Sequence, residues 1–225
     1  MPGPELTAAA RAKLEPVIAL LADADSAPTT VTDPKQAWSV HVADSLSGFE
    51  FPELAAAGAI ADVGAGAGFP GLVIAAELPE ARVDLIESIG RKCEFIDRAA
   101  EAGGIPNARA VNARSEDWAG SEGREAYDVV TARAVARLST LAELASPLLR
   151  EGGVLIAWKG RRDDDEEAEL ERGAPGLAME PAEVRWVGPY AGSENRHIHL
   201  IRKAGPTPPN LPRRAGMAKK RPAGS

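Results

Sequence analysis

Hydrophobic positions recur with two different periods along this chain. In the first 22 residues apolar side chains follow a helical spacing, which predicts a helix over residues 5–22, and a second helix is expected over 36–46. From residue 58 onward short apolar runs alternate with amphipathic stretches. This alternation predicts strands at about 59–63, 82–87, 108–111, 127–131 and 153–158, with helices at about 70–77, 90–102, 138–149 and 163–172.

The order of these elements indicates the fold class. Five β–α units in succession imply a parallel sheet with right-handed crossovers. Residues 184–187 and 197–201 form two further apolar runs with too little chain between them for a helix, which predicts an antiparallel pair. We therefore expect an α/β, Rossmann-like fold whose seven-stranded, mostly parallel sheet has an antiparallel edge strand. The single domain 1–225 would consist of an N-terminal helical cap (1–50), a core (51–203) and a basic C-terminal tail (204–225).

Charge is distributed unevenly along the 225 residues. The net charge at pH 7 is −7, yet from Arg202 onward there are seven basic residues and no acidic one, which leaves −14 for residues 1–201. An acidic body with a basic tail is a pattern of proteins that bind a polyanion at one edge. The alternative is a solvated terminus without a partner, which the Pro/Gly-rich composition of the tail also fits.

Composition narrows the class of protein further. The longest uncharged run, Val63–Ala76, has 14 residues and contains glycines, so it is too short to cross a bilayer. The N-terminus lacks the basic and apolar regions of a signal peptide. The single cysteine, Cys93, excludes an intramolecular disulfide and a cysteine-based metal cluster. We expect a cytoplasmic monomer with no metal site and no membrane contact.

A glycine-rich turn follows the first predicted strand. Asp62 ends the strand, four glycines follow between positions 64 and 71, and a helix begins directly after them. A strand, a glycine turn and a helix N-terminus together let backbone amides approach a polar ligand closely. The spacing Gly66-x-Gly68-x-x-Gly71, with Glu87 beyond it, also fits the fingerprint of dinucleotide-binding proteins. The turn alone therefore suits NAD as well as S-adenosylmethionine.

Two features favour S-adenosylmethionine. Asp62 would repel a pyrophosphate, whereas it would attract the sulfonium and ammonium groups of S-adenosylmethionine. The closing strand pair is typical of methyltransferases and not of dehydrogenases. Glu87 would then accept hydrogen bonds from the ribose hydroxyls. Ser115 and Glu116 would lie near the adenine, where Glu116 can accept a hydrogen bond from the amino group.

The residues from Asp62 to Gly71, Asp-Val-Gly-Ala-Gly-Ala-Gly-Phe-Pro-Gly, resemble the signature of the RsmG (GidB) family, which methylates N7 of a guanine in 16S ribosomal RNA. The resemblance covers about residues 36–222. Its further elements are His41-x-x-Asp44-Ser45-Leu46, Arg91-Lys92, Arg114-Ser115-Glu116, Thr131-Ala-Arg133-Ala, Lys159-Gly160, Arg196-His197 and Pro212-Arg213-Arg214 with Lys219. Two departures are minor: Glu87 stands where an aspartate is usual, and Thr131 where a serine is common.

The resemblance implies a class I methyltransferase that uses S-adenosyl-L-methionine and acts on 16S rRNA or the small ribosomal subunit. The expected donor-binding residues are Asp62, Gly64, Gly66, Gly68, Phe69, Glu87, Ser115, Glu116 and Arg133. The expected RNA-binding residues are Arg91, Lys92, Lys159, Arg196, Arg213, Arg214 and Lys219. Arg133, Lys159 and Arg196 are candidates for positioning the reactants, and no residue is assigned to catalysis.

The implied chemistry needs no general base. N7 of guanine carries an in-plane lone pair and no proton, so catalysis would rest on positioning and on excluding water. Two alternatives stay open: a methyltransferase of the same fold with a small-molecule acceptor, and a catalytically silent RNA-binding factor of ribosome assembly. For any single arginine the alternative to an RNA contact is a surface ion pair worth under about 1 kcal/mol, and this is expected for several of them. The charged stretch 163–172 is interpreted as a solvated helix face.

Overall fold

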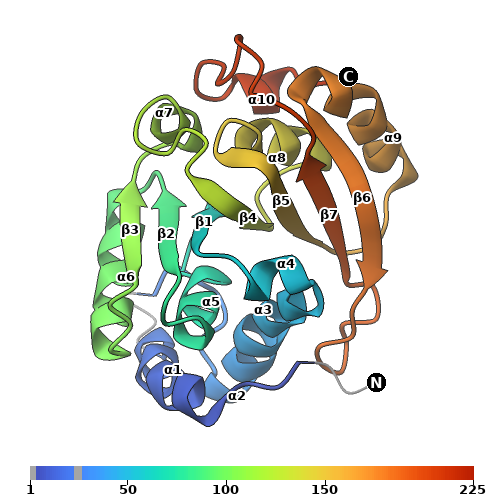
Figure 1. Ribbon diagram of the computed structural model, residues 1–225. Coiled ribbons are helices and arrows are strands. Elements are labelled where there is room, and N and C mark those ends of the chain that lie inside the picture. The colour runs from blue at the N-terminus through green and yellow to red at the C-terminus, as the bar shows by residue number, and fades with distance from the viewer. Residues whose placement is uncertain (1–3, 23–26) are drawn as a thin grey trace.

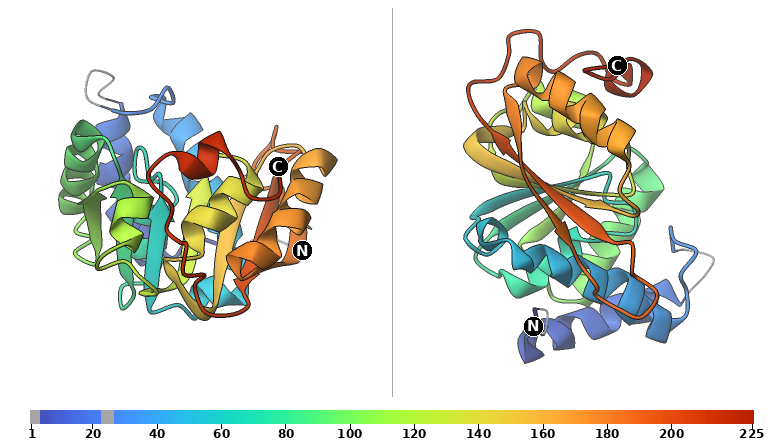
Figure 2. Two further views of the ribbon diagram at one scale, coloured as in Figure 1. Left: turned by 90° about the horizontal axis from the view of Figure 1, so that it is seen from above. Right: turned by 90° about the vertical axis from the view of Figure 1, so that its right-hand side faces the viewer.

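The computed structural model describes residues 4–22 and 27–225. These residues form one seven-stranded sheet with the strand order β3-β2-β1-β4-β5-β7-β6 and helices on both faces (Figure 1 and Figure 2). The strands are β1 (Ala59–Val63), β2 (Arg82–Glu87), β3 (Ala108–Asn112), β4 (Tyr127–Arg133), β5 (Leu149–Lys159), β6 (Met179–Trp186) and β7 (His197–Lys203).

Strands β1 to β5 are parallel, and β7 runs antiparallel to both β5 and β6. The prediction of a mostly parallel sheet with an antiparallel strand at one edge is confirmed, and β6 flanks β7 on its outer side. Strand β1 pairs with β2 on one side and with β4 on the other, so the order of the strands reverses there. Ligands of such sheets bind at this switch point, beyond the carboxyl ends of the strands.

Helices cover the sheet in two layers. One layer holds α1 and the short cap helices with α5 and α6, and the other holds α7, α8 and α9 (Figure 1). The helical segments are α1 (Ala8–Leu21), α2 (Pro34–Ala37), η1 (Trp38–Ala43), α3 (Asp44–Leu46), η2 (Ser47–Glu50), α4 (Pro52–Ala55), α5 (Gly71–Glu77), α6 (Gly90–Ala102), α7 (Ser115–Ala119), α8 (Leu138–Ala145), α9 (Asp164–Gly173), η3 (Ala174–Leu177) and α10 (Met217–Lys220). None of them has the length and hydrophobicity that a membrane span requires.

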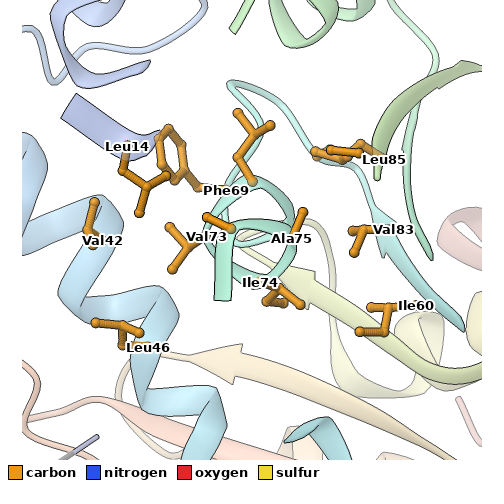
Figure 3. Packing of buried hydrophobic residues seen from close by; sticks show 14 of the residues in the cluster. Leu14, Val42, Leu46, Ile60, Phe69, Val73, Ile74, Ala75, Val83 and Leu85 are labelled. Atoms are coloured by element: carbon orange, nitrogen blue, oxygen red, sulfur yellow. The ribbon is translucent and has the colours of Figure 1, made fainter. Parts of the chain in front are cut away.

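A hydrophobic cluster attaches the N-terminal cap to the sheet. Leu14 of α1 and Val42 and Leu46 of the cap surround α5, whose residues 71–76 are all buried, and Ile60 of β1 closes the cluster from the sheet side (Figure 3). Residues 71–76 of α5 are apolar on every side of the helix, as is typical of a helix that is enclosed on all sides, here by the cap and the sheet. The start of α5 is therefore held firmly beneath the glycine turn.

The second cap helix differs from the single α-helix expected over 36–46. It begins at Pro34 behind the N-cap Asp33, and its middle, η1, is a π-helical turn. Turns of this width occur often at functional sites. His41 lies within η1 and Asp44 follows it directly, and both side chains are buried against the rest of the molecule.

Helix α9 is not a solvated face along its whole length, so that interpretation was wrong. Glu166 and Glu169 are only 7% and 8% exposed. They are buried because they meet hydrogen-bond donors on β5 and α8, which lie beside α9 only in the folded chain. Smaller differences concern the ends of elements: α8 ends at Ala145, and β5 already begins at Leu149.

The C-terminal segment folds back across the layer formed by α8 and α9. Leu211 and Ala218 are 4% and 1% exposed, and Arg172 of α9 donates a hydrogen bond from Nε to the carbonyl of Gly224 at 3.1 Å. Helix α10 contacts α8 and lies above it in Figure 1. The tail is therefore packed on the body rather than solvated.

Candidate active site

The turn after β1 has a backbone conformation that requires glycine. Gly64, Gly66 and Gly68 have φ angles of 70°, 60° and 92°, which residues with a side chain rarely adopt. The amides of Gly64 and Ala65 both donate to the carbonyl of Ile86, at 2.9 and 3.2 Å. The turn is thus tied to the end of β2, directly at the switch point of the sheet.

Asp62 supports this turn from behind. Its carboxylate is 1% exposed and accepts hydrogen bonds from the amide of Gly71 at 2.9 Å and from Oγ1 of Thr131 at 3.0 Å. Burial raises the pKa of Asp62 to about 6, although both hydrogen bonds oppose the shift. Because both oxygens already have protein partners, Asp62 connects β1, β4 and the first residue of α5.

Glu87 holds the turn from the side of β2. Its Oε2 accepts a hydrogen bond from the amide of Gly66 at 3.2 Å, and its Oε1 accepts one from the amide of Ile89 at 3.0 Å. Nζ of Lys92 lies 3.7 Å from Oε2. Glu87 is 7% exposed, and its small exposed part lies in a cavity.

That first cavity, the α7–α8 cavity, has a volume of about 230 Å³. It lies beyond the ends of β1 and β2 and is bounded by α7, α8 and the C-terminal segment. Oγ of Ser115 donates to Oε2 of Glu116 at 3.2 Å at one wall. The lining residues are Val63, Gly64, Ile86, Glu87, Ser88, Arg114, Ser115, Glu116, Val135, Ala136, Thr140, Leu144, Gly216, Ala218 and Lys219.

A second cavity, the cap cavity, lies between the glycine turn and the N-terminal cap and has a volume of about 360 Å³. Gly64 lines both cavities, and a Cβ atom on Gly64 would lie 2.8 Å from Cγ2 of Val135. The residue shared by the two cavities therefore has no room for a side chain. The lining residues are Pro28, Thr29, Val40, His41, Gly64, Ala65, Gly66, Ala67, Phe69, Lys92, Arg133, Ala134 and Arg196.

His41 and Phe69 form an aromatic wall of the cap cavity. Their rings are stacked, with centroids 4.7 Å apart and an angle of 11° between the ring planes. Burial, together with the charge of Arg133, lowers the pKa of His41 to about 4, so the imidazole is neutral at physiological pH. A neutral flat ring of this kind can contact an aromatic ligand without adding charge.

Asp44 holds two arginines beside His41, where Nη2 of Arg133 lies 3.5 Å from Nδ1 of the imidazole. Nη1 of Arg133 donates to Oδ2 of Asp44 at 2.9 Å and to the carbonyl of Val40 at 3.2 Å. Nε of Arg196 lies 3.2 Å from Oδ1 of Asp44, which is fully buried. The cap thus orients Arg133 from β4 and Arg196 from the segment before β7, two elements far apart in sequence.

The loop between β4 and α8 separates the two cavities and is held by α9. Nζ of Lys159 donates to the carbonyl of Ala136 at 3.1 Å and to Oε1 of Glu166 at 2.6 Å. The same oxygen of Glu166 accepts a hydrogen bond from the amide of Leu138 at 2.7 Å. Lys159 therefore points into the protein, where it orients the loop.

The remaining predicted residues occupy three further places. Gly68 lies behind the turn, where a Cβ would meet Cδ1 of Leu72 at 2.5 Å. Arg91 and Lys92 line a hollow of about 740 Å³ at the start of α6, beside the cap cavity. The basic residues of the tail divide: Arg213 is paired with Glu143, Arg214 and Lys219 are exposed, and Lys219 borders the α7–α8 cavity.

Sequence reasoning did not place Thr140, Ala136, Gly216 or Ala218 at the site. These residues come from α8, from the loop before it and from the C-terminal segment, and only the folded chain brings them together at the α7–α8 cavity. His41, which belongs to a family element without an assigned role, lies in the π-helical turn and lines the cap cavity. No spacing in the sequence indicates these positions.

The arrangement can bind a ligand with two chemically different ends on either side of Gly64. The α7–α8 cavity offers carboxylate acceptors and apolar walls together with Arg114 and Lys219, whereas the cap cavity offers basic side chains and an aromatic face but no carboxylate among the lining residues that the structure describes. Within residues 4–22 and 27–225, no group of three His, Cys, Asp or Glu side chains is placed to hold a metal ion.

Comparison with known proteins identifies the family. A family model described as GidB, rRNA small subunit methyltransferase G, matches residues 13–197. The chain belongs to the GidB family. Its sequence-based assignment to that family is thereby confirmed.

Among the curated members of the GidB family, the ribosomal RNA small subunit methyltransferase G of Rubrobacter xylanophilus is 42% identical over 194 residues, which cover 84% of this chain and 74% of the relative. The protein of that name from Desulfitobacterium hafniense is 36% identical over 195 residues, covering 86% and 80%. A solved structure described as cofactor-bound Rv0187 from MTB has a TM-score of 0.58 at 16% identity, covering 84% of this chain and 88% of that one, and so shares its fold.

Proposed function

We propose that this GidB-family protein transfers a methyl group from S-adenosylmethionine to N7 of a guanine in the 16S RNA of the small ribosomal subunit. The observation that carries the proposal is the position of Gly64, whose backbone lines two cavities of different chemistry. A donor extended across this turn would place its adenosine in the α7–α8 cavity and its sulfonium beside the cap cavity. The names of the curated relatives supply the substrate class.

The α7–α8 cavity suits the adenosine part of the donor. Glu87 lies at the end of β2, where its carboxylate can accept hydrogen bonds from ribose hydroxyls. Ser115 and Glu116 begin α7 at the far wall, where the carboxylate can accept a hydrogen bond from the adenine amino group. The apolar side chains of Val135 and Leu144 complete a slot for a flat ring.

The cap cavity suits the reacting end and the guanine. Arg133 and Arg196 are held by Asp44 and reach the cavity from two sides, where they can bind a carboxylate or an RNA phosphate. The neutral ring of His41 stacked on Phe69 offers a face to a base. The exposed Arg91 and the half-buried Lys92 place further basic groups beyond the cavity.

S-adenosylmethionine, when bound, supplies an electrophilic methyl group on a positively charged sulfur. N7 of guanine attacks with a lone pair and loses no proton, so the protein does not need to accept one at the reacting atom. The contribution of the chain is geometric: the turn at Gly64 aligns the donor, Asp44 orients the two arginines, and the cap excludes water. Asp62 contributes by holding the turn in shape.

Methyl transfer from labelled S-adenosylmethionine to small ribosomal subunits lacking this modification tests the proposal. We expect label in the RNA, at a single guanosine that becomes sensitive to reduction and aniline cleavage. Gly64→Asp should abolish donor binding, because the residue has a positive φ and no space for a side chain. Gly152→Asp is the matched control, since Gly152 also has a positive φ but has open space around it.

Two outcomes would replace the proposal by its alternatives. Label found only in a small molecule would indicate a different acceptor class. RNA binding without any donor binding in the unmodified protein would indicate a catalytically silent assembly factor.

A further inference from the structure

The C-terminal segment 211–225, which we call the strap, forms part of the wall of the α7–α8 cavity. Gly216, Ala218 and Lys219 line the cavity together with Glu87 and Glu116. The amide of Gly216 donates a hydrogen bond to Oε1 of Glu116 at 2.7 Å. The strap therefore contacts the carboxylate that the proposed function assigns to the adenine.

A second contact joins the strap to α8. Oγ1 of Thr140 donates to the carbonyl of Ala218 at 3.3 Å, and both residues also line the cavity. Two apolar side chains of the strap are also buried: Leu211 is 4% exposed and Ala218 is 1% exposed. The strap crosses the cavity mouth from α7 to α8 in a defined position.

Arg213 anchors the strap through a buried carboxylate. Its guanidinium forms a bidentate ion pair with Glu143 of α8, with 2.5 Å between Nε and Oε1. Nη2 also donates to the carbonyl of Arg221 at 2.7 Å. Glu143 is 4% exposed, and this fork-shaped pairing fixes the orientation of the guanidinium. Arg213 is therefore committed to an internal contact.

We propose that the strap is a structural component of the donor site, and that Arg213 is the positioning residue that keeps it in place. The inference rests on the proposed function and extends it, because it adds a segment of the basic tail to the binding of the methyl donor. Losing the Arg213–Glu143 pair would release the strap from Glu116 and Thr140. If only a tenth of the molecules then keep the strap in place, the apparent Kd of the donor rises about tenfold.

Calorimetric titration of the full-length protein with S-adenosylmethionine and with S-adenosylhomocysteine tests this assignment. Arg213→Ala should raise the Kd of both ligands about tenfold, and Glu143→Gln should do the same. The double variant should be no worse than either single variant, because the two side chains act through one contact. Arg221→Ala is the matched control: it removes an exposed guanidinium from the strap that forms no ion pair within the described residues, and should leave the donor Kd within about twofold.

Limited trypsin digestion of the unmodified protein provides a second measurement that does not depend on a variant. Cleavage after Arg214, Lys219 and Lys220 should slow several-fold in the presence of S-adenosylhomocysteine, because binding stabilises the strap in its packed position. The same ligand should protect Arg213→Ala much less. A merely structural role of the ion pair would change thermal stability without this ligand-dependent protection.

The failure of this inference is distinct from a failure of the proposed function. Donor affinity that is equal in the unmodified protein and in Arg213→Ala, with trypsin cleavage independent of ligand, would overturn the role of the strap. Weakened RNA binding as the sole effect of Arg213→Ala would make the segment an RNA-binding arm. A lack of donor binding in the unmodified protein would overturn the proposed function itself.

Discussion

At the scale of single residues, Asp62 shows how burial and hydrogen bonding oppose each other in the site. Its carboxylate is enclosed by protein, yet it accepts hydrogen bonds from Gly71 and Thr131 and so joins three elements below the turn. Folding raises the pKa of Asp62 from 3.8 to about 6. Between these two values the native protein holds a proton that the unfolded chain releases. The stability linked to this proton is complete below about pH 4 and is lost as the pH rises through about 6.

Asp62→Asn should therefore flatten the dependence of stability on pH between 4 and 7. The lost hydrogen bond lowers the free energy of unfolding of the variant by the same amount at every pH, because an amide oxygen cannot accept both hydrogen bonds. The difference in free energy of unfolding between the two proteins should shrink as the pH rises, because only the unmodified protein loses the stability linked to the proton. We expect this change to be on the order of 2–3 kcal/mol over the range. Chemical denaturation at a series of pH values measures it. Parallel stability curves for the two proteins would show that Asp62 titrates normally.

At the scale of elements, helix α9 holds the loop between β4 and α8 in place, although this loop comes earlier in the sequence. Glu166 binds Lys159 and the first amide of α8, and Glu169 binds Ser139 and Arg137. These contacts position the loop that contributes Val135 and Ala136 to the α7–α8 cavity. Asp164, Asp165 and Glu171 of α9 are exposed, whereas Glu167 pairs with Arg162 and Arg172 binds the carbonyl of Gly224.

Glu166→Gln should lower the free energy of unfolding by about 1–3 kcal/mol, because it leaves the partly buried ammonium of Lys159 without a charged partner. The substitution should also weaken donor binding, because the loop that Glu166 holds contributes Val135 and Ala136 to the α7–α8 cavity. Thermal unfolding and donor titration measure the two effects. Glu171→Gln is the matched control on the exposed side of the same helix and should leave both unchanged. Equal effects of the two substitutions would exclude a specific role for Glu166.

At the scale of the whole molecule, acidic and basic residues are distributed unevenly. The body to residue 201 carries −14, while exposed basic groups lie near the cap cavity and on the strap. Glu87 and Ser115, which we propose as donor contacts, are in contrast buried. Salt screens exposed charges much more than buried ones. RNA binding and donor binding should therefore differ in their response to ionic strength.

The logarithm of the RNA association constant should fall linearly with the logarithm of salt concentration, by about 0.7–0.9 for each phosphate neutralised. Replacing Arg91 by Ala should reduce that slope by about one phosphate contact. Donor affinity over the same salt range should change by less than about twofold. Filter binding and calorimetry provide the two data sets. A flat salt dependence for RNA would mean that the basic surface does not contact the backbone.

Features that depend on residues close together in the sequence were predictable. The strand, turn and helix from Asp62 to Gly71 follow from apolar runs and glycine spacing, and the order of the elements follows from alternating periods. The position of Glu87 in a cavity follows as well, because carboxyl ends of parallel strands meet at one edge. The partners of Lys159 and Arg213 were not predictable, since a basic side chain has the same local signature whether it meets a phosphate or a buried carboxylate.

The sequence by itself determined the fold class, the family and the strand–turn–helix conformation around the glycines, because these depend on local backbone preferences and on residues at fixed spacing. The tertiary structure decided which charges are internal. It placed Asp44 between Arg133 and Arg196, two carboxylates of α9 against α8, and the strap across the α7–α8 cavity. Each of these contacts joins segments far apart in the chain. Because the partners meet only when the chain folds, their local spacing does not indicate them.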